Sequence, residues 1–171
     1  MAEFLPAFEK MIKNEGGYQL HTVQGDRGGM TYAGIARKFH PLWPGWVLLD
    51  SGERDNPKLT QMVRNFYLEK FWSRVHGKDI KNQAVAENLF DFAVNTGPRV
   101  AVKLAQVVAG ATPDGAMGPK TVTAINDIDP GNFIIAYAMA KVTRYAGICN
   151  RNKSQKKFLL GWINRTLRGV A

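Results

Sequence analysis

Apolar side chains recur along most of the chain at intervals of three and four residues, the spacing of one face of an α-helix. In the first segment with this spacing, the apolar positions are Phe4, Phe8, Met11 and Ile12. The pair Gly16-Gly17 ends the segment, because glycine readily adopts the left-handed conformation of a helix C-cap. The same spacing predicts further helices over 58–74, 82–95, 98–109, 130–149 and 155–168, and a short helix that begins at Gly118-Pro119.

Two segments depart from this pattern. Residues 18–35 place short runs of β-forming residues around a turn-forming cluster at 25–29, which predicts a small, irregular β-hairpin. Residues 40–57 hold three prolines and two tryptophans, and we interpret them as a structured loop. The predicted fold class is therefore mainly α, with one small β-hairpin near the N-terminus.

Two of the predicted helices also carry predictions about burial. In the helix over 130–149, the residues expected on the buried face are Ile134, Ala138, Val142, Tyr145 and Cys149. Cys149 is the single cysteine, so no internal disulfide can form and we expect a core thiol. In the helix over 155–168, the basic residues should face solvent and the residues expected to be buried are Phe158, Leu159, Trp162 and Ile163.

Positive charge is concentrated in the second half of the chain. The sequence holds 23 Lys and Arg against 14 Asp and Glu, a net charge of +9. Residues 1–98 carry 12 basic and 11 acidic residues, whereas residues 99–171 carry 11 and 3. We therefore divide the chain into halves at residue 98 and expect them to pack as one compact unit. The basic half favours polyanions such as nucleic acid, anionic lipid or a charged cell wall, and the alternative is a solvated basic face without a specific partner.

Composition excludes several classes of protein. Hydrophobic residues make up 45% of the chain and charged residues 22%, which is typical of a globular protein. No apolar run approaches the ~18 residues of a membrane-spanning helix. The first residues lack the basic and apolar character of a secretory signal, so we expect synthesis in the cytoplasm. The spacing of the three His and one Cys predicts no metal site, and we expect no cofactor.

Glu15 is placed like a chemically active residue. It follows Phe4, Phe8 and Met11 at helical spacing, so it continues the apolar face into the last turn of the first predicted helix. The negative end of a helix dipole and partial burial both favour the neutral, protonated carboxyl group. A carboxyl group that keeps its proton is what a general acid requires. The alternative is an exposed glutamate at a frayed helix end.

The predicted hairpin offers partners for such an acid. A general acid that protonates a glycosidic oxygen works with a second polar group, which stabilises the oxocarbenium-like state or orients water. Asp26 and Thr31 are the candidates for this group. The alternatives are an ordinary turn-forming aspartate and a plain strand hydroxyl.

Five motifs occur in order along nearly the whole chain. They are E-G-G-Y at 15–18, D-x-G-G-x-T-x-x-G-I at 26–35, L-F-D-F-A-V-N-T-G-P at 89–98, D-G-x-x-G-P-x-T at 114–121 and G-W-x-N-R at 161–165. The first two resemble the bacteriophage-type N-acetylmuramidases of glycoside hydrolase family 108. The third resembles that family's central helix, and the last two resemble its C-terminal peptidoglycan half.

This resemblance implies lysozyme activity on a mostly α-helical, lysozyme-like fold. The implied reaction is hydrolysis of the β-1,4 bond between N-acetylmuramic acid and N-acetylglucosamine in peptidoglycan. Glu15 matches the family's catalytic glutamate. Asp26 and Thr31 match positions that, by analogy with phage lysozymes, would assist water or the sugar. Arg27 stands where proline is common in the motif, which concerns the local turn more than the chemistry.

Further residues are candidates for binding the substrate. Tyr18, Trp43 and Trp46 have rings that can stack on sugars, although aromatic residues more often serve packing. Asn95 ends the predicted helix over 82–95, so it either lines the substrate cleft or caps the helix. Of these, Tyr18 and Asn95 are the predicted substrate-binding residues.

Together these observations favour an endolysin, a monomeric muramidase made in the host cytoplasm that reaches the wall through a membrane pore or dedicated export. Its basic half would bind the anionic cell envelope. Three alternatives stay open: a wall-loosening secretion accessory with the same chemistry, a peptidoglycan-binding module without activity, and a basic nucleic-acid-binding domain. No specific nucleic-acid partner is expected, because the sequence carries no recognised nucleic-acid-binding motif.

Overall fold

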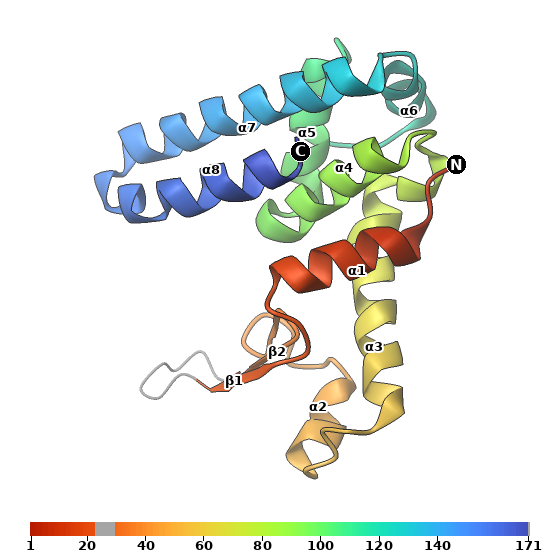
Figure 1. The fold of residues 1–171 in the computed structure, drawn as a ribbon, viewed down its shortest axis with the longest axis vertical. Coiled ribbons are helices and arrows are strands. Elements are labelled where there is room, and N and C mark those ends of the chain that lie inside the picture. Colours follow the sequence, from red (N-terminus) through yellow and green to blue (C-terminus); the bar gives the residue numbers. More distant parts are fainter. Residues whose placement is uncertain (23–29, 171) are drawn as a thin grey trace. The chain divides into compact units, whose positions relative to one another are not determined.

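The computed structural model describes residues 1–22 and 30–170, and most of these residues lie in helices (Figure 1). The predicted fold class, mainly α, is confirmed. The chain forms two compact units. Phe4–Lys70 is the N-terminal unit, and Met1–Glu3 together with Phe71–Ala171 is the C-terminal unit. The division of the chain into two halves at residue 98, packed as one compact unit, stays a prediction.

The first helix of the N-terminal unit begins and ends where its sequence pattern places it. Helix α1, Phe4–Asn14, buries Ala7, Phe8, Met11 and Ile12. Its end is closed by a hydrogen bond of 2.8 Å from the Gly17 N–H to the Ile12 carbonyl. Gly16 and Gly17 have φ angles of 88° and 77°, the left-handed conformation that the glycine pair predicts.

The β element that follows is larger than the predicted hairpin. Strands β1 (Leu20–Thr22), β2 (Met30–Tyr32) and β3 (Ile35–Ala36) form an antiparallel sheet in the order β1-β2-β3. The third strand was missed because only the Ala33-Gly34 pair separates it from β2. Both residues have positive φ angles, 49° and 78°, as a two-residue hairpin turn requires. The turn cluster at 25–29 lies outside the described residues.

The structured loop expected over 40–57 contains a short helix, α2, Gly45–Asp50. Pro44 precedes it with a φ of −64°, which suits the start of a helix, but six residues are too few to show a helical period. Helix α3, Pro57–Tyr67, is also shorter than the predicted helix over 58–74. The chain continues in a π-helical turn and two 3₁₀ turns, η1 (Leu68–Trp72), η2 (Ser73–Val75) and η3 (Gly77–Asp79).

The C-terminal unit is built from helices. They are α4 (Gln83–Thr96), α5 (Pro98–Val108), α6 (Pro119–Asn126), α7 (Pro130–Arg151), the 3₁₀ helix η4 (Lys153–Phe158) and α8 (Leu159–Arg168). Three of them begin with proline at the first position, as the sequence predicts for the short helix at Gly118-Pro119. Helices α4 and α5 pack on each other, and α7 and α8 lie side by side (Figure 1).

A buried glutamine organises the loop between α5 and α6. The Gln106 amide nitrogen donates to the Asp114 carboxylate at 2.7 Å and to the Thr121 hydroxyl at 3.2 Å, and the Gln106 amide oxygen accepts the Gly115 N–H at 2.8 Å. Hydrogen bonds from the Ala116 N–H and from Gln106 hold the pKa of Asp114 below its ordinary value. Three residues of the D-G-x-x-G-P-x-T motif therefore shape this loop.

The buried face of α7 differs from the predicted one. Its buried residues are Phe133, Tyr137, Lys141, Tyr145 and Cys149, so Tyr145 and the core thiol of Cys149 are confirmed. The prediction was wrong for three residues, which are only half-buried: Ile134, Ala138 and Val142. An apolarity pattern cannot select Lys141, which is 4% exposed. Its ammonium lies 3.2 Å from the Asn88 amide oxygen and 4.6 Å from the centre of the Tyr137 ring.

The last predicted helix is also corrected. Its first part is the 3₁₀ helix η4, and Phe158 is 46% exposed rather than buried. Leu159, Trp162 and Ile163 are half-buried. Arg165 does not simply face solvent, because its guanidinium makes two hydrogen bonds of 2.9 Å to the Asp91 carboxylate. Within the described part of the chain, no helix combines the length and the apolar character needed to cross a membrane.

Lys141 makes stability depend on pH. Burial lowers its pKa from 10.5 to about 8, with the Asp91 carboxylate opposing the shift and the Arg165 cation adding to it. Between pH 8 and pH 10.5, Lys141 is protonated more often in the unfolded chain than in the folded chain, so its contribution to stability rises with pH. Below pH 8 its full cost, about 3 kcal/mol, is present.

We therefore expect Lys141→Met to stabilise the protein at pH 7. The gain is up to about 3 kcal/mol from removing the buried charge, and the lost hydrogen bond to Asn88 reduces it by about 1 kcal/mol. The advantage over the wild type should shrink as pH rises from 8 to 10.5. Urea denaturation of both proteins across this pH range measures the difference between their free energies of unfolding. The nearby tyrosines are present in both proteins, so their contributions cancel in this difference. An advantage that is constant with pH would contradict the assignment.

Candidate active site

Glu15 lies directly after α1 and is half-buried. Its N–H donates to the Met11 carbonyl at 3.1 Å, so the backbone still follows the helix. The two glycines that follow leave space among the described residues, since a Cβ added at Gly16 or Gly17 would meet none of their atoms within 4 Å. A half-buried carboxyl group is thus set beside a stretch of backbone that a ligand can approach.

The side chain of Glu15 packs against the turn between β2 and β3. A Cβ placed on Gly34 would lie 3.3 Å from the Glu15 Oε2 and 3.4 Å from the Glu15 Cβ. It would lie only 2.5 Å from the hydroxyl of Tyr67. The φ of Gly34 is +78°, which also disfavours a side chain. Glycine at position 34 is therefore what allows the carboxyl group its place.

The neighbouring residue of this turn is fixed through both of its backbone groups. The N–H of Ala33 donates to the Gln19 carbonyl at 3.1 Å. The carbonyl of Ala33 accepts a hydrogen bond of 2.8 Å from the Tyr67 hydroxyl. Ala33 and Tyr67 are both buried. The surface against which Glu15 packs is thus held by contacts from outside the turn.

Thr31 lies in the strand that leads into this turn. It is half-buried in the central strand β2, paired with His21 on one side and Ala36 on the other. The structure therefore places Thr31 in the same small sheet that backs Glu15. Asp26, the other predicted partner, lies outside the described residues. The roles of both residues stay predictions.

The two residues predicted to bind substrate belong to different units. Tyr18 in the N-terminal unit is 39% exposed, and its hydroxyl bonds to Arg64. Partial burial raises the pKa of this phenol, and the Arg64 cation opposes that effect. Asn95 is an exposed residue of the last turn of α4 in the C-terminal unit. The cap of that helix is Gly97 rather than Asn95.

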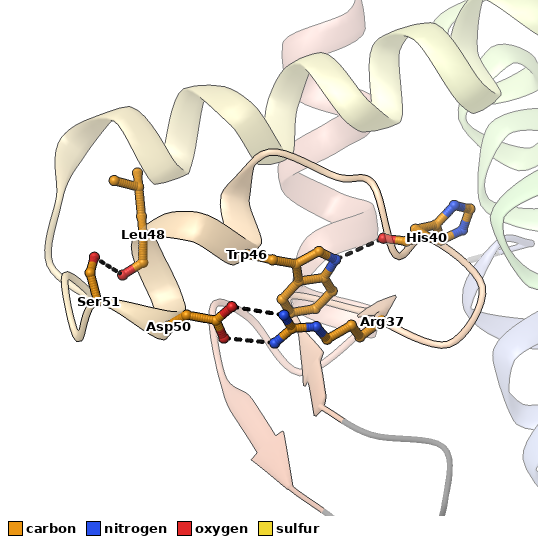
Figure 2. A network of polar contacts seen from close by, with 6 residues as sticks. All are labelled: Arg37, His40, Trp46, Leu48, Asp50 and Ser51. Carbon is orange, nitrogen blue, oxygen red and sulfur yellow. Dashed lines mark hydrogen bonds and ion pairs between the residues drawn. The ribbon is translucent and has the colours of Figure 1, made fainter.

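The loop tryptophans serve packing, the alternative to sugar binding. Trp43 and Trp46 are only 7% and 2% exposed, and their ring centres lie 5.0 Å apart. Figure 2 shows how the surrounding segment is closed. The Arg37 guanidinium faces the Asp50 carboxylate with hydrogen bonds of 2.6 and 2.7 Å, and the Trp46 indole N–H donates to the His40 carbonyl at 2.7 Å (Figure 2). The Arg37 hydrogen bonds lower the pKa of Asp50.

Two residues at the site were not singled out from the sequence. Gly34 stood inside the D-x-G-G-x-T-x-x-G-I motif, so a signal for it existed. Tyr67 carried no signal, because it falls among the apolar positions of a helix and its hydroxyl partner is 34 residues away. Across residues 1–22 and 30–170, no three His, Cys, Asp or Glu residues gather in a way that would hold a metal ion.

The fold and this site define a mainly α-helical protein with a carboxyl group backed by a small antiparallel sheet. The chain belongs to the glycosyl hydrolase 108 family, whose model matches residues 8–97. A second model, described as a "Predicted Peptidoglycan domain", matches residues 100–167. The protein is therefore a glycoside hydrolase with a lysozyme-like action on peptidoglycan.

A solved structure shares the fold over nearly the full length of both chains. The structure of Brucella abortus SagA superposes with a TM-score of 0.65 at 24% sequence identity, covering 98% of this chain and 95% of that one. No curated protein matches the chain.

The packing at position 34 predicts a specific loss of activity. Gly34→Ala forces a Cβ toward the Tyr67 hydroxyl and the Glu15 carboxyl group, so we expect hydrolysis of peptidoglycan to fall about 10- to 100-fold. Gly52→Ala is the matched control, because Gly52 has a φ of +85° and its added Cβ would meet no atom of residues 1–22 or 30–170 within 4 Å. Both variants should lose about 1 kcal/mol of stability to backbone strain. Equal activities of the two variants would count against the packing argument.

Proposed function

We propose that this protein is an N-acetylmuramidase in which Glu15 is the general acid. The observation that carries the proposal is the half-buried carboxyl group at the end of α1, packed against Gly34 and beside the open glycine pair. The membership of the glycosyl hydrolase 108 family supports it. The bond hydrolysed is the β-1,4 linkage between N-acetylmuramic acid and N-acetylglucosamine.

In this proposal Glu15 donates its proton to the glycosidic oxygen as the bond to the leaving sugar breaks. A second polar group stabilises the positive charge that develops on the sugar ring or orients the attacking water. Thr31 on β2 and Asp26 are the proposed assisting residues. Tyr18, with its partly exposed ring, and Asn95 are the proposed contacts to the glycan.

The Glu15→Gln variant tests the acid directly. It keeps the shape of the side chain and removes the proton that is transferred, so we expect clearing of purified peptidoglycan suspensions to fall at least about 100-fold with the fold retained. Glu9→Gln, an exposed position on the same helix, is the control with the same change of charge. A fully active Glu15→Gln variant would reject the mechanism.

We further propose that the protein acts as an endolysin on the cell wall, after release through a membrane pore or dedicated export. An exposed basic surface on the C-terminal unit supports binding to an anionic envelope. It comprises Arg151, Lys153, Lys156 and Lys157, next to the exposed ring of Phe158. Arg165 is excluded from this surface because it is paired with Asp91.

Neutralising three of these lysines tests the envelope contact. Lys153, Lys156 and Lys157 changed to Gln should weaken binding to cell envelopes and flatten its salt dependence, while hydrolysis of small soluble glycan fragments stays unchanged. The control replaces three exposed lysines elsewhere, Lys38, Lys58 and Lys78, and so has the same net charge. If both triple variants bind equally well, net charge rather than this surface governs binding.

A further inference from the structure

We propose that Tyr67 is a positioning residue for Glu15, and that its phenol holds the Ala33-Gly34 turn against the carboxyl group. The inference rests on the proposed function, because it concerns the group assigned there as general acid. Tyr67 is buried at the end of α3, so it acts through the turn and not on the substrate.

The turn needs support from outside. Both central residues have positive φ angles, 49° for Ala33 and 78° for Gly34. Asn-Gly and Gly-Gly are the pairs that favour this conformation, whereas the Cβ of alanine disfavours it. A conformation that the local sequence disfavours persists only where surrounding contacts determine it.

Tyr67 supplies such a contact at the residue that needs it. Its hydroxyl donates to the Ala33 carbonyl at 2.8 Å across 34 positions of sequence, in a buried setting. Without the Tyr67 hydroxyl, the buried Ala33 carbonyl would have lost this hydrogen-bond donor, which is energetically unfavourable. The turn would then move to bring the carbonyl to another donor or to water. The next residue is Gly34, and a Cβ added there would lie 3.3 Å from the Glu15 Oε2. A movement of the turn would therefore change the packing around the Glu15 carboxyl group.

The ring of Tyr67 also contacts the helix that carries Glu15. Its centre lies 5.9 Å from that of Phe8 on α1. One side chain thus touches both the helix that presents the carboxyl group and the turn that backs it. Directly after Tyr67, the chain enters the π-helical turn η1, a feature frequent at functional sites.

A purely structural role is the alternative, and the chain offers a matched control for it. The hydroxyl of Tyr137 on α7 donates to the Ala101 carbonyl on α5 at 2.9 Å, a hydrogen bond that is also buried and also joins two segments far apart in the sequence. Tyr137 belongs to the C-terminal unit. Removing either hydroxyl deletes the same kind of hydrogen bond, but only the Tyr67 hydrogen bond supports the Ala33-Gly34 turn beside Glu15.

The experiment compares Tyr67→Phe with Tyr137→Phe in the full-length protein. Both should lose thermal stability to a similar degree. We expect Tyr67→Phe to lower kcat about 10-fold with KM unchanged, and to change the pH profile of the rate. Tyr137→Phe should keep the wild-type kcat and pH profile. Wild-type kcat and pH profile in Tyr67→Phe, or equal losses in both variants, would overturn the inference.

A double-variant cycle gives an independent readout. The added Cβ of Gly34→Ala would lie 2.5 Å from the Tyr67 hydroxyl, so removing that hydroxyl relieves the contact. The fold-loss of activity caused by Gly34→Ala should therefore be smaller in the Tyr67→Phe background than in the wild type. Multiplicative losses would contradict the coupling. Failure of the proposed function is distinguished by Glu15→Gln, since an active Glu15→Gln variant rejects the acid whatever Tyr67 does.

Discussion

The contact between the end of α1 and the Ala33-Gly34 turn is the constraint on which the N-terminal unit depends. The helix must end just before Glu15 for the carboxyl group of that residue to meet the turn, and the hydrogen bond from Gly17 to Ile12 closes that end. The sheet must keep its register, because Tyr32 and Ile35 pair on either side of the turn. A shift of one strand by one residue would turn its side chains to the opposite face and take Gly34 from its place in the turn.

Local signals in the sequence predicted most helix boundaries and missed the features set by distant contacts. Glycine after α1 and proline at the start of α5, α6 and α7 act on the backbone of their own segment, so they can be read locally. Helix α2 could not be read in this way. Its Trp46 is buried against Trp43, and its Asp50 pairs with Arg37, which precedes the helix by eight residues.

The candidate site divides in the same manner. Glu15 could be selected from the sequence, because its helical spacing from Met11 and the glycines after it are local properties. Tyr67 could not, because nothing in the α3 pattern indicates that one of its buried aromatic residues donates to a carbonyl across the unit. Motifs, too, required the structure for their interpretation. In D-G-x-x-G-P-x-T, the residues Asp114, Gly115 and Thr121 bond to Gln106 and so maintain a loop.

Net charge alone overstates the surface available to an anionic partner. Two basic residues that composition assigns to the C-terminal half are used within the fold. Lys141 is buried among aromatic rings, and Arg165 neutralises Asp91. Four of the exposed cations of this half lie close together in sequence over 151–157, where no acidic side chain occurs, whereas Arg99, Lys120 and Arg168 lie outside this segment. Because screened attraction acts only over about 8–10 Å, a compact cluster binds a charged surface more strongly than the same charges spread over the unit. The binding to an anionic envelope that we propose therefore rests on this short segment more than on the net charge of the whole basic half.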